Sequence, residues 1–260
     1  MTKQLLIYED IVPVSKVDHR EMSVRQTSDF GFASEINTAP IVDVEFAKVA
    51  ATMPIVFAEA QTGLVPCALL GAANDTNSFV AKDGEWTGGY VPAFFRRYPF
   101  VFATLEESET LTLCLDKSYA GLNEDGEGER LFDSAGTETG YTRGVLRFVE
   151  EYQATFARTQ ALCDRLDALG LFEEARIDYT LADGSQGGVT GFKRVSGEKL
   201  RALPDEKIVE LFRSGDLDLI QVHLMSLLQI ESLVERLADV VTAESDAGEE
   251  LSAPEKKKLN

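Results

Sequence analysis

Two adjacent arginines, Arg96 and Arg97, lie in the segment of the chain that is richest in aromatic residues. Residues 89–100 contain five aromatic side chains and two prolines, although the whole chain is only 9% aromatic. A guanidinium group binds carboxylates and phosphates through paired hydrogen bonds, and aromatic faces hold it by cation–π contact. The pattern predicts a surface that binds an anion or a partner. The alternative is internal, with the arginines anchored by acids of this chain and the rings in its core.

Other residues are candidates for the same surface. Trp86 and Tyr90 precede the two arginines, and Tyr98 follows them. His19 lies in a stretch that we predict to be a turn. Three alternatives are open for its side chain: it is exposed on the surface, it caps the turn, or it belongs to the binding site. We predict a ligand- or partner-binding site from six residues: His19, Trp86, Tyr90, Arg96, Arg97 and Tyr98.

His223 is one of the two histidines in the chain and lies in a segment that is apolar on nearly every side. A helix of that kind is buried, which predicts a hydrogen-bonded core histidine. Ser226 follows three residues later and shares its helix face. A serine–histidine nucleophile pair is the alternative, but no orienting acid or oxyanion loop is evident near it.

Motifs for common cofactors and metals are missing from the sequence. It contains no phosphate-binding P-loop, no dinucleotide-binding glycine pattern and no nucleophile elbow. The three cysteines, Cys67, Cys114 and Cys163, are widely spaced within apolar runs, which predicts buried free thiols rather than a disulfide framework or zinc site. We therefore expect no cofactor and no metal.

The charge balance restricts the partners. A formal net charge of −19 favours solubility and opposes non-specific binding to nucleic acid or anionic membrane. The first residues lack the pattern of a secretory signal peptide, and we see no apolar run long enough to span a bilayer. These features predict a cytoplasmic protein that binds no nucleic acid, has no membrane span and could form oligomers.

The helices and strands expected from the sequence, which must position these residues, indicate an α+β fold. Residues 54–116 read as a mostly antiparallel sheet, with a hairpin of 54–58 and 64–70, a short strand at 77–80, and a hairpin of 100–105 and 110–115. Helices are expected at 141–169 and 217–240, and another hairpin joins 175–181 to 188–195. We expect one domain over residues 1–242, with a smaller lobe at 171–242 as an option, and a flexible polar tail at 243–260.

Several segments carry a family resemblance: Pro13-Val14-Ser15 with His19-Arg20, Glu45-Phe46-Ala47 with Pro54-Ile55-Val56-Phe57, Asn77-Ser78-Phe79-Val80, Gly84-Glu85-Trp86, residues 90–100, and Gly215-Asp216-Leu217 with His223-Leu224-Met225-Ser226-Leu227. The resemblance is to the bacterial SapC family and covers roughly residues 5–240. It implies an association with bacterial surface-layer systems and, from the proteins found beside family members, an accessory role. It supplies no catalytic residues.

Three functions remain open at this point. The first is a soluble accessory protein that recognises a partner protein or an anionic small molecule through the aromatic–arginine surface. The second is an enzyme that uses His19, an arginine and carboxylates, with or without a divalent metal; it requires these groups in one concave pocket. The third is a structural protein of surface-layer type, which requires a self-complementary exposed apolar patch.

Overall fold

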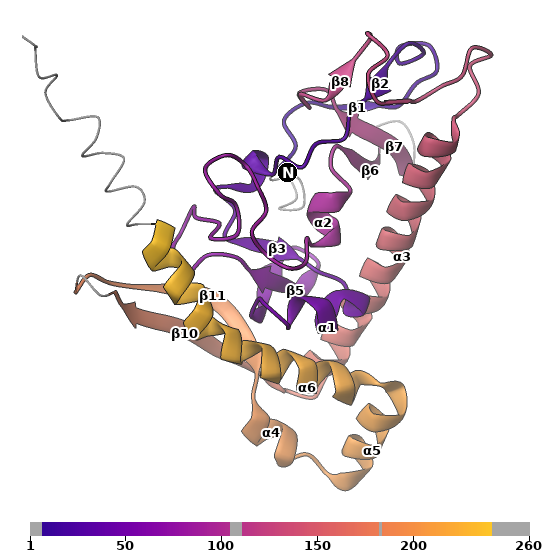
Figure 1. Ribbon diagram of the computed structural model, residues 1–260. Helices are drawn as coiled ribbons and strands as arrows, with labels where there is room; N and C mark the ends of the chain where they lie inside the picture. The colour runs from indigo at the N-terminus through magenta and orange to yellow at the C-terminus, as the bar shows by residue number, and fades with distance from the viewer. Residues whose placement is uncertain (1–6, 105–110, 182–183, 241–260) are drawn as a thin grey trace, which may run out of the picture.

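The computed structural model describes residues 7–104, 111–181 and 184–240. It confirms the expected α+β class, because helices pack against three sheets whose strand pairs are antiparallel (Figure 1). The predicted tail at 243–260 lies outside the described residues. The division into a domain at 1–242 and a lobe at 171–242 stays a prediction.

The largest sheet has five strands in the order β10-β11-β4-β5-β3. Its strands are β3 (Thr38–Pro40), β4 (Ile55–Ala60), β5 (Gly63–Leu69), β10 (Phe172–Thr180) and β11 (Gln186–Val195). The β4–β5 and β10–β11 hairpins confirm the sequence prediction. Because β11 pairs with β4, strands from both halves of the chain share this sheet.

Two smaller sheets lie at the other end of the molecule (Figure 1). One contains β1 (Ile11–Pro13), β7 (Leu111–Asp116) and β6 (Phe100–Thr104), and the other β8 (Leu122–Asn123), β2 (Ser23–Val24) and β9 (Glu129–Arg130). The β6–β7 hairpin was predicted, and its connection at 105–110 lies outside the described residues. Leu113 and Leu115 are buried as the alternation requires, whereas Leu111 at the start of β7 is half exposed.

The long helix α3 (Gly140–Ala168) connects the two ends of the molecule (Figure 1). Thr139 caps it by accepting a hydrogen bond from the Thr142 N–H, and Gly170, at φ +66°, follows its end. It contacts β5 of the large sheet and β6 of the smaller one. The helix therefore packs against both sheets and borders the region between them.

The chain after β11 is helical. It forms α4 (Gly197–Arg201), α5 (Asp205–Ser214), α6 (Asp216–Ser226) and η4 (Leu227–Gln229), and the helix continues to Val240. Among the described residues this helix, Asp216–Val240, is long and apolar enough to cross a membrane by length and composition alone, with a mean hydropathy of 1.3. This differs from our expectation of no such run, although the helix itself was predicted at 217–240.

Several short helices lie among the strands. They are η2 (Gly31–Ala33), η3 (Asp43–Glu45), α1 (Phe46–Val49) and α2 (Ala93–Arg96). The strand expected at 77–80 is wrong: this stretch is a turn with one isolated bridge from Val80 to Trp86. Asn77 explains the difference, since its side chain accepts a hydrogen bond from the Phe79 N–H and donates one to the Ala33 carbonyl.

Candidate functional site

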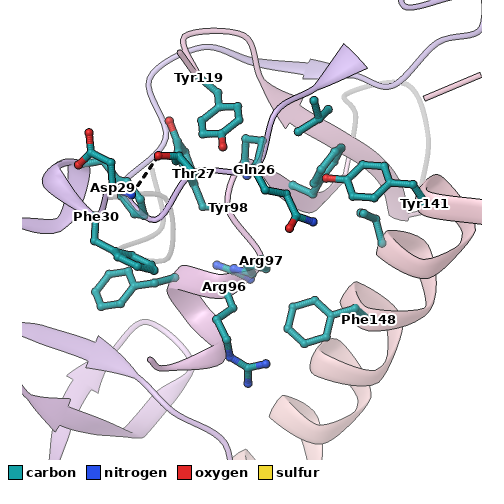
Figure 2. Close-up of a pocket in the computed structure, with 16 residues that line it drawn as sticks. Gln26, Thr27, Asp29, Phe30, Arg96, Arg97, Tyr98, Tyr119, Tyr141 and Phe148 are labelled. Atoms are coloured by element: carbon teal, nitrogen blue, oxygen red, sulfur yellow. Dashed lines mark hydrogen bonds between the residues drawn. The ribbon is translucent and has the colours of Figure 1, made fainter. Parts of the chain in front are cut away.

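A cavity of about 270 Å³ lies between α3, α2 and the chain that follows β2 (Figure 2). Its wall is mainly aromatic, formed by Phe30, Phe32, Phe95, Tyr98, Phe100, Tyr119, Tyr141 and Phe148. Arg96 and Arg97 belong to the same lining, as do the polar residues Gln26, Thr27 and Asp29. We call this cavity the aromatic pocket.

The single turn of α2 sets the directions of the arginines. Phe94 and Phe95 are buried, Arg96 is exposed and Arg97 is buried again. Successive residues of a helix are rotated by about 100°, so neighbours do not share a face. The two arginines therefore have different surroundings although they are adjacent in sequence.

Arg96 is held in one orientation at the edge of the pocket. Its Nε donates to the Val91 carbonyl at 3.0 Å, and its Nη2 donates to the Tyr90 hydroxyl at 2.9 Å. The guanidinium carbon lies 5.4 Å from the ring centroids of both Tyr90 and Phe148. Its Nη1 has no hydrogen-bond partner within the described ranges, and 43% of the side chain is exposed. Figure 2 shows the side chain extending beside Phe148. Arg96 thus has a free donor available to a ligand.

Glu45 supports this arrangement from inside the protein. Its side chain is buried, and Oε1 accepts hydrogen bonds from the Tyr90 hydroxyl at 2.8 Å and from the Ala93 N–H at 2.6 Å. Oε2 accepts from the Val42 N–H at 3.0 Å, and Arg96 Nη2 lies 4.0 Å from Oε1. Burial, reinforced by Glu45, raises the pKa of Tyr90 to about 12. Tyr90 therefore stays protonated, and its hydroxyl links the two residues by donating a hydrogen bond to Glu45 and accepting one from Arg96.

Arg97 has an internal position. Only 5% of it is exposed, and its guanidinium carbon lies 4.7 Å from the Phe94 ring centroid and 4.8 Å from that of Tyr152. The Tyr8 ring is at 5.8 Å. Burial raises the pKa of Tyr8 to about 12, with Arg97 acting in the opposite direction. Arg97 is therefore internal and lies against aromatic rings, whereas the internal alternative placed acids of this chain beside it, and Arg96 remains the candidate for ligand contact.

The other sequence-predicted residues are divided between the pocket and its surroundings. Tyr98 lines the pocket and stacks on Phe32 with ring centroids 4.4 Å apart. Trp86 is not among the lining residues; it packs behind them against Phe95 at 5.8 Å. Tyr90 holds Arg96 as described.

His19 is not brought to the pocket. It is buried in the turn between β1 and β2, where its Nδ1 accepts a hydrogen bond from the Ser15 N–H at 3.0 Å. This is the turn-capping alternative. Asp29 is the one carboxylate among the described lining residues, and its Oδ1 accepts from the Gly31 N–H at 2.7 Å. Hence the histidine, arginine and paired carboxylates that the enzyme alternative requires do not meet in this pocket.

His223 and Ser226 have the structural role predicted for a core histidine. His223 is fully buried; its Nε2 accepts from the Val195 N–H and its Nδ1 donates to the Ile55 carbonyl, each at 3.0 Å. Ser226 Oγ donates to the His223 carbonyl and accepts from the Ile55 N–H. The serine does not bond to the imidazole, so no nucleophile pair forms. Burial lowers the pKa of His223 to about 4.

No metal-binding cluster is found in the part of the chain that the structure describes. The three cysteines are buried and free, as predicted. Glu45, Gln26 and Asp29 were missed as site residues. Glu45 lies in a stretch that also contains the charged residue Lys48, so its burial could not be predicted from the local sequence.

Comparison with known proteins gives one match. The SapC family model matches residues 14–233, a range that includes every residue lining the aromatic pocket. Neither the curated proteins nor the solved structures gave a match.

Proposed function

Because the chain belongs to the SapC family, we propose that it is a ligand-binding accessory protein of that family. In this proposal the aromatic pocket takes a compact small molecule with an aromatic or otherwise apolar body and one anionic group. Arg96 binds the anionic group, and the rings of Phe32, Tyr98 and Phe148 enclose the body.

One observation carries this proposal: Arg96 is oriented before any ligand arrives. Two of its nitrogens are held by Val91 and Tyr90 while Nη1 is free. A side chain that is already ordered loses little conformational entropy on binding, so more of the interaction energy appears as affinity. A charge-assisted hydrogen bond of this kind contributes about 1.5–3 kcal/mol.

The aromatic wall defines the rest of the ligand. Edge-to-face or offset ring contacts add about 0.5–1.5 kcal/mol each beyond the area they bury. The volume of about 270 Å³ is near the lower limit of small-molecule pockets, which favours a compact ring system over a long chain. Aromatic carboxylates match both the apolar wall and the free donor.

The binding proposal is tested with carboxylic acids and their neutral amides. We expect benzoate, phenylacetate and 2-naphthoate to bind, and at least one of them to bind about tenfold more tightly than its primary amide, because the amide lacks the charge that Arg96 attracts. Isothermal titration calorimetry and ligand-observed NMR measure the affinities. Equal affinity for acid and amide throughout the series, or no binding of either, would contradict the proposal.

A further inference from the structure

The C-terminal helix carries an exposed ridge that its fold leaves without a partner. Between Asp218 and Glu235 its exposed residues recur every three or four positions and therefore lie on one face of the helix. In order they are Asp218, Gln221, Met225, Leu228, Glu231 and Glu235. Met225 is 67% exposed and Leu228 is 79% exposed, the latter equalling the highest value among the large hydrophobic residues. We call these six residues the α6 ridge.

The opposite face of the helix is fixed to the body of the protein. His223 and Ser226 bond to Ile55 and Val195, and Ile220 and Leu233 are buried. Figure 1 shows the helix along the outside of the molecule beside β10 and β11. The ridge therefore faces away from the sheets, and no residue that lines the aromatic pocket lies on this helix.

Charge distinguishes the ends of the ridge from its centre. Asp218 lies before the two apolar residues, and Glu231 and Glu235 lie after them. None of these three carboxylates forms an ion pair among the described residues. Arg236 is the one basic Lys or Arg of the helix, and it turns away: its guanidinium carbon lies 4.6 Å from the Phe79 ring centroid, and Nη1 donates to Thr87. The acids of the ridge are thus uncompensated within the described chain.

We propose that the α6 ridge docks an amphipathic helix of a partner protein, apolar at its centre and rich in lysine or arginine at both ends. Met225 and Leu228 would pack against the apolar centre, where both sides lose water-exposed surface. Asp218 at one end and Glu231 with Glu235 at the other would attract the basic ends and fix the register.

The same charges disfavour two other occupants. In a two-fold contact between copies of this chain, the acidic end of one ridge would lie against the acidic end of the other. An anionic lipid surface would be repelled by these acids and by a net charge of −19. Both occupants remain outcomes that the experiment distinguishes.

The experiment titrates the full-length protein into a fluorescently labelled helical peptide with leucines at its centre and lysines at its ends. A peptide with glutamates in place of the lysines is the charge control. The variant Met225→Ser/Leu228→Ser tests the apolar centre, and Glu231→Gln/Glu235→Gln tests the acids. Val17→Ser/Val44→Ser is the matched control, because these valines are 79% and 66% exposed and lie off the helix.

We expect saturable binding of the lysine peptide, with affinity lower by about tenfold or more in Met225→Ser/Leu228→Ser. In Glu231→Gln/Glu235→Gln we expect weaker binding that depends less on salt. The glutamate peptide should not bind, Val17→Ser/Val44→Ser should behave as wild type, and hydrogen exchange should slow on the helix Asp216–Val240. Circular dichroism confirms that each variant is folded.

Four results would overturn the proposal. The first is absence of lysine-peptide binding, or equal binding by the ridge variant and the wild type. The second is a dimer that Met225→Ser/Leu228→Ser dissociates, which identifies a second copy as the occupant. The third is ridge-dependent binding to phosphatidylglycerol vesicles. The fourth is a gain in peptide affinity when residues 241–260 are deleted, which identifies this chain's own basic residues 256–258 as the occupant.

Discussion

Neighbouring residues of the same type have different roles in this protein, and the two arginines show this most clearly. Arg97 is enclosed by Phe94 and Tyr152, whereas Arg96 keeps a free donor at the edge of the aromatic pocket. Their shared chemistry gave no basis for separating them in the sequence. The one-turn helix α2 separates them, because it rotates each side chain away from its neighbour.

Substitution of the two arginines should therefore affect different properties. We expect Arg97→Gln to lower the free energy of unfolding by about 2–3 kcal/mol, since it removes a buried cation from between two rings and leaves a poorly fitting amide. Arg96→Gln should change it by less than about 1 kcal/mol, because the side chain is substantially exposed. Urea unfolding followed by circular dichroism measures both values. Similar losses in the two variants would show that the arginines are not divided in this way.

Glu45 is a positioning residue, because it acts on Arg96 through Tyr90. Its contact with the Ala93 N–H joins residues 48 positions apart in the sequence, and its contact with Tyr90 determines where Arg96 can lie. No local pattern predicts such a role, because the partners come together only when η3 and α2 are packed. The resemblance of residues 45–47 to a family element marked the position without explaining it.

Sequence periodicity predicted the regular helices and hairpins of this protein but not the irregular segments that form the aromatic pocket. The hairpins β4–β5, β6–β7 and β10–β11, the helix α3 and the C-terminal helix all follow from spacing in the sequence. The aromatic pocket does not, because its wall comes from the loop after β2, one turn of helix and one face of α3. The loop, which contributes Gln26, Thr27 and Asp29, has no periodic pattern to detect.

Docking of the C-terminal helix on the large sheet should depend on pH. His223 bonds to Ile55 and Val195 in its neutral form, and its pKa is lowered from 6.5 to about 4 in the folded state. Between these values the unfolded chain binds more protons than the folded chain, so stability rises with pH. We expect protonation of this group alone to remove roughly 1–2 kcal/mol of stability as the pH falls from about 6.5 to about 5.

Chemical unfolding at several pH values measures this dependence, and NMR titration of the His223 ring locates it. The variant His223→Gln should show a smaller change in stability over the same interval, because it has no imidazole to protonate. A ring that titrates near its ordinary pKa in the folded protein would contradict the assignment.

For the whole molecule, the structure separates two candidate functions in space. The aromatic pocket lies between α2, α3 and the loop after β2, and the α6 ridge lies on a helix that contributes no residue to the pocket wall. Family membership over residues 14–233 covers the whole pocket and nearly the whole ridge, since Glu235 alone lies outside the match. Ligand binding and partner binding are thus expected to be separable by mutation.

The central claim is that Arg96 selects an anionic ligand, and a double-mutant cycle tests it most directly. The cycle compares 2-naphthoate with 2-naphthamide on the wild type and on Arg96→Gln, with Arg176→Gln as a control arginine that is exposed and paired with Asp178. We predict that the acid loses at least about tenfold in affinity in Arg96→Gln while the amide changes little, a coupling of about 1.4 kcal/mol or more. Equal changes for acid and amide in Arg96→Gln, or the same coupling in Arg176→Gln, would contradict the claim.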